Sequence, residues 1–282
     1  MARIAVAAAQ GPLPLEAIDL AHSKGLAEAL LFGDEKQIIE LAKVSNFDLS
    51  KASIIHAETD AEAAALAARA CAAGEADILM KGALHTDVFM KAAIRRDNGL
   101  RADKRFIHLF ALYPPEGPPI LVSDAAVNVN PDMAALQASL TNMVEIWHKL
   151  GVPRPKIALL SATEHPIPSV PSSEMMAELQ AWSEDENLAA DIRGPLALDL
   201  ILSAQAAEIK GLKADPVAGN ADGIIVPDLV SGNVLFKSLV YIGGAVAAGV
   251  ITGAKVPILL TSRADPPAAR LASIALASLL RD

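Results

Sequence analysis

The stretch Ile258-Leu-Leu-Thr-Ser-Arg-Ala-Asp-Pro-Pro267 has the pattern that decides the fold. Its apolar run predicts a buried strand, a short polar loop follows the strand, and Asp-Pro-Pro opens a helix. Met80 to Asp87 and Pro227 to Asn233 repeat this order of strand, loop and helix start. Repeated units of this kind predict an α/β fold in which helices cover a mostly parallel sheet.

The same alternation of apolar runs and Ala/Leu-rich helical segments extends along the chain. Strands are predicted at 4–9, 29–32, 54–55, 78–80, 107–111, 120–122, 156–160, 224–226 and 258–260. Helices are predicted at 17–24, 36–45, 61–74, 88–97, 133–150, 172–184, 197–210, 234–242 and 268–280. The predicted fold class is therefore α/β throughout.

A change of domain is expected where Asp124 to Pro131 interrupts the alternation, just before a long helix that Asp132 caps. A second crossing is expected near Gly253 to Pro257. We therefore predict a discontinuous first domain, residues 1–128 plus 255–282, a second domain, residues 129–254, and a cleft between the two.

Composition narrows the class of protein. The 282 residues are 52% hydrophobic and carry a net charge of −9, which predicts no nucleic-acid partner and leaves anionic substrates to a few local cations. The single cysteine, Cys71, excludes a disulfide within the chain and favours a cytoplasmic location. It lies among alanines, so we expect it to pack in the core. Residues 238–260 are weakly charged, but Pro257 and internal glycines interrupt them, and we predict no membrane segment.

Ser262 and Arg263 are the sharpest candidate site residues, because they directly follow a predicted strand and precede a helix start. A hydroxyl, a guanidinium and helix-start amides together suit the geometry of phosphate. The alternative is a capping loop with an incidental surface arginine.

The second candidate loop begins at Lys81-Gly82, where a glycine lets the backbone approach a ligand. Thr86 or Asp87 is expected to cap the next helix. His85 is a candidate proton carrier, and its alternative is a solvated histidine. Lys91 lies about one turn into the helix and either faces the cleft or is an ordinary solvated lysine.

In the third loop, Asp228, Gly232 and Asn233 are candidates to receive a pantetheine or phosphate group. The alternative is an ordinary helix start with Asn233 as its N-cap. Asp222 and Asp228 have no compact set of His or carboxylate partners at metal-ligand spacing, so we predict no metal site.

Six motifs in order resemble successive blocks of the phosphate acetyltransferase and phosphate butyryltransferase family. They are Lys81-Gly82 with Thr86, 123–131, Gly194-Pro-Leu-Ala-Leu-Asp199, 216–222, 226–233 and Leu260-Thr-Ser-Arg-Ala-Asp265. The resemblance implies a two-domain α/β structure related to isocitrate and isopropylmalate dehydrogenases, with the active site in the interdomain cleft and a homodimeric assembly.

The implied reaction is acyl-CoA plus phosphate giving acyl phosphate plus CoA, by direct transfer of an acetyl or butyryl group in a ternary complex. Coenzyme A is then a substrate, and no cofactor is expected. Ser262 matches the family serine that hydrogen-bonds the reacting carbonyl or thiol, and Arg263 matches the arginine that holds phosphate. Thr261, beside them, is predicted to bind substrate.

The chain departs from the acetate-specific members at two positions. Their aspartate seven residues after the serine, a proposed base for the CoA thiol, is replaced by Ala269, which leaves the base open among Asp265, His85 and Glu164. An arginine in their first-lobe helix corresponds to Lys91, which keeps the charge and loses the bidentate geometry. The residues around Ser262, Thr261-Ser-Arg-Ala-Asp265, resemble butyryltransferase-type and hydratase-fused transferase sequences more closely.

Three other functions stay open from the residues. They are a dehydrogenase on the related fold, a membrane-associated acyl-carrier-protein:phosphate acyltransferase, and a CoA-binding protein that lost catalysis with the base.

Overall fold

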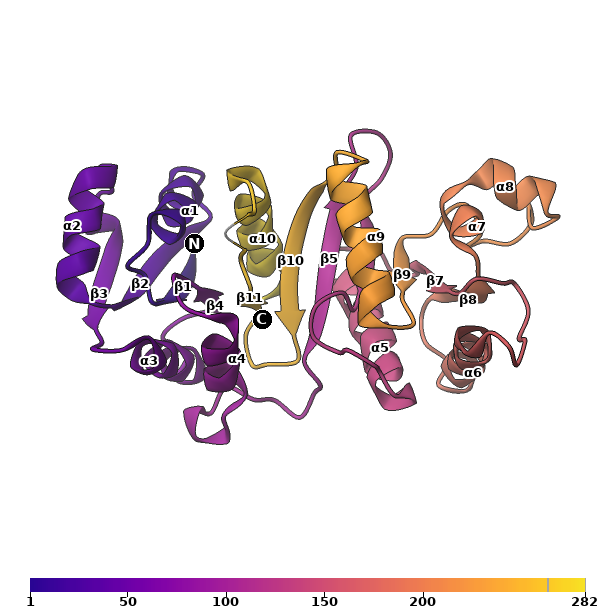
Figure 1. Ribbon diagram of the computed structural model, residues 1–282, viewed down its shortest axis with the longest axis horizontal. Coiled ribbons are helices and arrows are strands. Elements are labelled where there is room, and N and C mark those ends of the chain that lie inside the picture. The colour runs from indigo at the N-terminus through magenta and orange to yellow at the C-terminus, as the bar shows by residue number, and fades with distance from the viewer. Residues whose placement is uncertain (263, 282) are drawn as a thin grey trace. The chain divides into compact units, whose positions relative to one another are not determined.

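The computed structural model describes residues 1–262 and 264–281, and it shows a mixed α/β fold of mostly parallel strands flanked by helices (Figure 1). The chain forms two compact units. Unit 1 comprises Met1–Phe106 and Ala248–Asp282, and unit 2 comprises Ile107–Ala247. The domain bounds drawn from the sequence stay a prediction.

Unit 1 is built on strands that run in the order β3-β2-β1-β4-β11-β10. Their bounds are β1 (Ala2–Ala7), β2 (Ala27–Gly33), β3 (Ala52–His56), β4 (Ile78–Lys81), β10 (Val246–Thr252) and β11 (Ile258–Leu259). Neighbouring strands pair in parallel except β10, which runs antiparallel to β11.

The α-helices of unit 1 cover both faces of these strands. They are α1 (Pro12–Ser23), α2 (Glu35–Ser45), α3 (Asp60–Ala72), α4 (Thr86–Ile94) and α10 (Pro267–Leu280), with 3₁₀ turns at Leu49–Lys51 and Arg96–Asn98. Helix α1 packs against α10, and α3 packs against α4, on opposite sides of the strands in Figure 1. The fully buried Ile4, Ile18, Leu79 and Phe89 form part of the core between these layers.

The order of the strands in unit 1 creates a place for a ligand. From β1 the chain moves outward to β2 and β3, and then returns to pair β4 with the other side of β1. The loops after β1 and β4 therefore lead to opposite faces. In parallel sheets ligands bind at such a switch point, at the carboxyl ends of the strands.

Unit 2 is likewise built on mostly parallel strands, which run in the order β5-β6-β9-β7-β8. The strands are β5 (Ile107–Tyr113), β6 (Ile120–Ser123), β7 (Lys156–Leu160), β8 (Asp191–Leu196) and β9 (Gly223–Ile225). The helices are α5 (Met133–Lys149), α6 (Pro171–Asp185), α7 (Leu198–Leu202), α8 (Ala204–Ile209) and α9 (Leu229–Tyr241). Strand β5 pairs antiparallel with β6, whereas β6 with β9, β9 with β7, and β7 with β8 pair in parallel. Asp132 caps α5, as predicted, by accepting from the backbone N–H of Ala135 at 2.8 Å.

Two strands escaped the sequence patterns. Strand β8, Asp191-Ile-Arg-Gly-Pro-Leu196, contains charges, a glycine and a proline, and pairing with β7 overrides these weak strand formers. Strand β10 lies in the small-residue stretch that the sequence divided into a helix, a turn and one strand. The predicted helix 197–210 is in fact two helices, because the Ser203 side chain accepts from the N–H of Ala206 and starts α8.

Among the helices formed by residues 1–262 and 264–281, none combines the length and hydrophobicity needed to cross a bilayer.

Candidate active site

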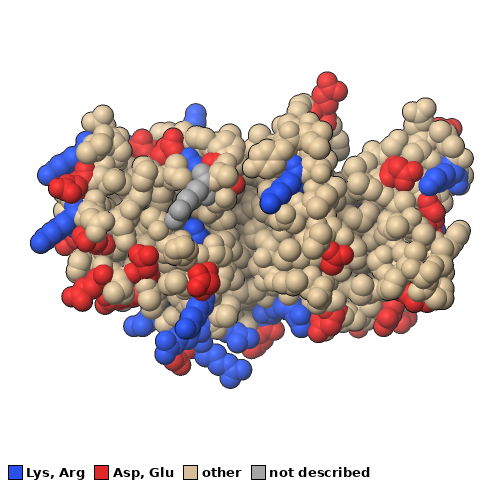
Figure 2. Space-filling view, viewed as in Figure 1, with Lys and Arg blue, Asp and Glu red and all other residues tan. Residues whose placement is uncertain are grey.

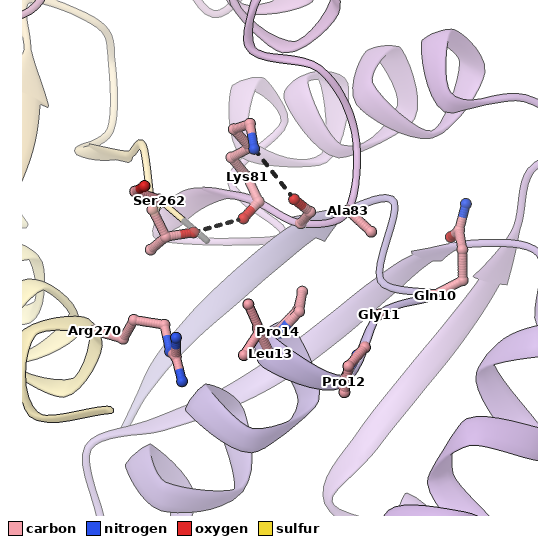
Figure 3. A pocket seen from close by; sticks show the side chains of 11 residues that line it. Gln10, Gly11, Pro12, Leu13, Pro14, Lys81, Ala83, Ser262 and Arg270 are labelled. Carbon is pink, nitrogen blue, oxygen red and sulfur yellow. Dashed lines mark hydrogen bonds between the residues drawn. The ribbon is translucent and has the colours of Figure 1, made fainter. Parts of the chain in front are cut away.

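A pocket of about 320 Å³ opens at the switch point of unit 1 (Figure 3). It lies at the ends of β1, β4 and β11, the positions where three loops leave the sheet. Its described lining residues are Gln10, Gly11, Pro12, Leu13, Pro14, Lys81, Gly82, Ala83, Thr261, Ser262 and Arg270. Two of the three loops predicted from the sequence therefore meet here, and the loop after β1 joins them.

Gly82 is needed because the loops after β1 and β4 touch. Its N–H donates to the carbonyl of Ala7 at 2.8 Å, and that of Ala83 donates to the carbonyl of Ala8 at 2.7 Å. A Cβ on Gly82 would lie 2.3 Å from the carbonyl oxygen of Ala8, a distance that real Cβ atoms do not adopt. The close approach that Gly82 permits is thus to the backbone after β1.

The loop after β11 presents Ser262 at the pocket. The backbone N–H of Ser262 donates to the Asp265 carboxylate at 2.7 Å, and its Oγ accepts from the N–H of Ala264 at 3.2 Å. Thr261 joins this loop to the β4 end by donating from Oγ1 to the carbonyl of Lys81 at 3.0 Å. Burial raises the pKa of Asp265, while the Ser262 N–H and the Arg270 charge act in the opposite direction. Arg263 lies outside the described residues.

Arg270 is a pocket residue that the sequence did not single out. Its side chain is only 3% exposed, and Nη1 donates to the carbonyl of Asp265 at 2.7 Å while Nη2 forms an ion pair with Glu16 of α1 at 2.5 Å. Within the residues that the structure describes, its Nε has no hydrogen-bond partner. The signal available in the sequence was a lone arginine in the first turn of an otherwise apolar helix, one turn beyond the Ser262 loop.

Lys81 is the second cation of the pocket. Lys81 is only 7% exposed, and its Nζ donates to the carbonyl of Gly82 at 3.4 Å. On the face seen in Figure 2, basic and acidic side chains are intermingled and separated by wide neutral areas. Buried cations at the pocket are therefore the groups best placed to hold an anion, because solvent screens them less than surface charges.

The remaining candidates of the β4 loop lie on α4. His85, Thr86 and Lys91 are exposed and are not among the described lining residues of the pocket. Helix α4 begins at Thr86 with His85 as N-cap and without a side-chain capping bond. The predicted cap by Thr86 or Asp87 is therefore wrong. The roles of the three residues toward substrate stay predictions.

The third predicted loop belongs to unit 2. Asp228, not Asn233, is the N-cap of α9, because its carboxylate accepts from the N–H and Oγ of Ser231, both at 2.9 Å. The helix accordingly starts five residues before the predicted position. Gly232 packs on the carbonyl of Asp124, which a Cβ would approach to 2.7 Å, and the Asn233 Nδ2 donates to the carbonyl of Ala125 at 3.4 Å.

Asp124 organises the loop after β6, against which Gly232 and Asn233 lie. Its buried carboxylate accepts from the backbone N–H groups of Ala126 and Val127, both at 2.9 Å, and from the Asn128 Nδ2 at 2.7 Å. Longer bonds come from the N–H groups of His108 at 3.2 Å and Asn128 at 3.3 Å. The Asp124 carboxylate thus holds residues 126–128 in place, within the segment 124–131 where the sequence predicts a change of domain.

Glu164, the third candidate base, also lies in unit 2. The Lys210 Nζ donates to its Oε1 at 2.7 Å, and this hydrogen bond lowers the pKa of Glu164. A carboxylate with a lowered pKa is a weaker base for a thiol.

Cys71 does not have the features of an acyl acceptor. It is buried in α3, as predicted, and burial raises its pKa to about 12. The thiolate is the reactive form of cysteine, so this thiol is inert near neutral pH. Within the described residues, no three His, Cys, Asp or Glu side chains form a group that could hold a metal ion.

Buried His108 leads to a prediction about pH. Its ring lies 4.3 Å from that of Phe110, which stacks on Phe236 at 3.8 Å between centroids. Burial lowers the pKa of His108 from 6.5 to about 4, against the opposing charge of Asp124. The unfolded chain therefore binds a proton that the folded chain does not, and acid favours unfolding.

We expect the melting temperature of the wild type to fall more steeply than that of His108→Gln as the pH drops from 6.5 toward 4. Melting curves of both proteins at several pH values in this range measure the difference. Parallel pH dependences of the two proteins would contradict a neutral buried His108.

The comparisons with known proteins agree on one family. The family model described as "Phosphate acetyl/butaryl transferase" matches residues 59–278. The chain is 41% identical over 276 residues to a probable phosphate butyryltransferase of Bacillus subtilis (strain 168), covering 97% of this chain and 91% of that protein. It is 40% identical over 254 residues to a phosphate acetyltransferase of Rickettsia prowazekii (strain Madrid E), covering 89% of this chain and 72% of that protein.

A solved structure agrees with these relatives. The crystal structure of a branched-chain phosphotransacylase from Enterococcus faecalis V583 matches over 100% of both chains, with a TM-score of 0.89 and 31% identity. The family match extends over most of the chain, and the resemblance drawn from six short motifs is confirmed. The chain therefore belongs to the phosphate acetyl/butyryl transferase family.

Proposed function

We propose that this protein is an acyltransferase that converts acyl-CoA and phosphate into acyl phosphate and CoA. Family membership supports the reaction class. The observation that carries the proposal in this chain is the pocket at the switch point of unit 1, where Ser262 lies with the buried cations Lys81 and Arg270. A hydroxyl donor and two cations suit a reaction between a carbonyl carbon and a phosphate dianion.

In the proposed reaction, a phosphate oxygen attacks the thioester carbonyl, the carbon–sulfur bond breaks, and CoA leaves as a thiolate that then gains a proton. The Ser262 hydroxyl donates to the carbonyl oxygen, which becomes negative in the transition state. A donor placed in this way contributes on the order of 3 kcal/mol. Direct transfer is part of the proposal, and buried Cys71, whose thiol has a raised pKa, is not an acyl acceptor in it.

The base that accepts the thiol proton in the reverse direction is proposed to be Asp265. Its pKa is raised by burial, which brings a carboxylate closer to the range useful for proton transfer, and it bonds the backbone of Ser262. His85 and Glu164 are the weaker candidates. Lys91, Thr86, Asp228, Gly232 and Asn233 remain proposed contacts of the phosphate and CoA groups.

The experiment that tests the function is release of free CoA thiol from a panel of acyl-CoA donors, with and without phosphate. We expect release that depends on phosphate and produces acyl phosphate. Release without phosphate would indicate a thioesterase, and CoA binding without turnover would indicate a binding protein. The replacement of the acetate-type aspartate by Ala269 is the feature that favours this second candidate.

We expect this activity to need no metal or other cofactor, because hydroxyl and cationic groups of the chain itself line the pocket. Activity measured in excess chelator should equal that of untreated enzyme at the same ionic strength. A strict requirement for added Mg²⁺ or Zn²⁺ would contradict this expectation.

Arg263 is proposed to hold phosphate, on the strength of its position beside Ser262 in the matched motif. Arg263→Ala should raise the KM for phosphate about tenfold or more, because hydrogen bonds to charged groups contribute about 1.5–3 kcal/mol. The KM for CoA should change far less. Arg263→Lys should recover only part of the loss, since it lacks the planar fork. Equal losses for both substrates would point to a structural role instead.

We further propose a cytoplasmic homodimer in which two domains of the dehydrogenase-related fold enclose the substrates. Helix α9 supports the assembly, because Val230, Val234 and Tyr241 are 68%, 59% and 73% exposed on it. Apolar side chains left in water on one helix favour a contact with another protein. Sedimentation of the purified protein tests the dimer, and a monomer at micromolar concentration would contradict it.

A further inference from the structure

The first loop of the pocket has an unusual chemistry for a switch point. Helix α1 begins at Pro12, and Pro14 follows two residues later, so neither position has a backbone N–H. The N–H of Ala9 donates to the carbonyl of Phe32 at 2.9 Å, and the N–H of Gly11 donates to the carbonyl of Ala9 at 2.8 Å. Helix starts at switch points commonly bind phosphate through such N–H groups. Here the loop has few of them to offer.

The side chains of this loop are apolar toward the pocket. Pro12, Leu13 and Pro14 line it from the α1 side, and Figure 3 shows them between Arg270 and Gln10. The amide nitrogen of Gln10 donates to Asp60 at 3.2 Å, while its Oε1 is buried and has no hydrogen-bond partner among the described residues. Ala83 extends this apolar wall from the β4 loop, and a Cβ on Gly11 would come within 2.9 Å of the Ala83 Cβ. The two loops thus touch through apolar groups at Gly11 and Ala83.

The opposite side of the same pocket is polar. Lys81 and Ser262 lie there, whereas Arg270 reaches from α10 toward the start of α1, where it pairs with Glu16 (Figure 3). A ligand that fits both sides has a carbonyl or anionic group beside Ser262 and a short hydrocarbon group against Pro12-Leu13-Pro14. The volume of about 320 Å³ lies near the lower end of ligand sites, which hold roughly 300–1,000 Å³.

We propose that Pro12, Leu13 and Pro14 form the acyl-chain pocket of the enzyme and that Leu13 sets its depth, so that four- and five-carbon acyl groups react better than acetyl. This inference rests on the proposed function. The pantetheine arm of CoA is a poorer occupant, because its amide groups need hydrogen-bond partners and two prolines in this wall have no N–H to donate. An acyl chain needs only apolar contact.

The test is the ratio of kcat/KM for butyryl-CoA to that for acetyl-CoA. In Leu13→Phe, which fills the pocket, this ratio should fall about tenfold relative to the wild type, since one methylene in an apolar pocket changes discrimination by roughly 10- to 200-fold. In Leu13→Ala, which deepens the pocket, the kcat/KM for hexanoyl-CoA should rise relative to that for butyryl-CoA. Leu20→Phe is the matched control, because Leu20 lies on the same helix and is not among the described pocket residues. Its ratios should equal those of the wild type.

Melting curves of each variant establish that it is folded before its kinetics are compared, and Leu13→Ala carries the test if Leu13→Phe does not fold. Unchanged ratios in both Leu13 variants would overturn the acyl pocket while leaving the transferase function in place. A loss of affinity for free CoA in Leu13→Phe, equal to the loss for butyryl-CoA, would place the pantetheine arm there and overturn it as well. Failure of the proposed function is a separate result, in which the wild type releases no CoA from any donor when phosphate is added.

Discussion

Ser262→Ala is expected to lower kcat by about 100-fold or more, as is typical when one donor to a developing oxyanion is lost. The structure separates this effect from a loss of stability. The Ser262 hydroxyl accepts one bond, from the N–H of Ala264 at 3.2 Å, and both residues are exposed, so water can replace it. The melting temperature and the affinity for CoA should therefore stay close to those of the wild type. Steady-state kinetics and a melting curve on the same preparation measure both quantities.

Ser278→Ala is a suitable control for this experiment. Ser278 lies on α10 and donates to the carbonyl of Ile274 at 2.8 Å, so the change also removes one local hydroxyl bond from unit 1. Its kcat should be unchanged. A nearly normal kcat in Ser262→Ala, combined with a lower melting temperature, would remove Ser262 from the mechanism and make it a residue that shapes the loop.

Asp124→Ala is expected to destabilise the protein by about 3 kcal/mol or more, because a buried donor without an acceptor costs about 1–3 kcal/mol. The side chain that is removed accepts from Ala126, Val127 and the Asn128 side chain. The loop after β6, on which Gly232 and Asn233 pack, would lose its organising group. The urea concentration at the unfolding midpoint measures the loss.

Asp124→Asn provides the matched comparison, because it keeps the shape and one acceptor oxygen while it removes the charge. We expect its midpoint to lie between those of Asp124→Ala and the wild type. If Asp124→Ala unfolded at the same urea concentration as the wild type, the loop would have to be held by other contacts.

The sequence predicted the elements of the fold where local pattern and tertiary packing agree. Strand β7 has the predicted bounds, 156–160, and α5 begins directly after the capping Asp132. Strand β8 and the start of α9 were missed, for different reasons. The pairing of β8 with β7 outweighs the poor strand propensity of Arg193-Gly194-Pro195. Asp228 caps α9, which begins at Leu229, five residues before the predicted start at 234.

Some residues of the candidate site could likewise be found from local sequence, and others only from the tertiary structure. Lys81, Gly82, Thr261 and Ser262 could be found from the sequence, because a polar loop after a buried strand is a local pattern, and their family follows from six such motifs in order. Arg270 and the Pro12-Leu13-Pro14 wall could not be found in that way. Arg270 is 254 residues from its ion-pair partner Glu16, and the wall becomes part of a site only because β1 lies beside β4. A strand order formed by distant hydrogen bonds brings these residues together, and neither their spacing nor their composition encodes it locally.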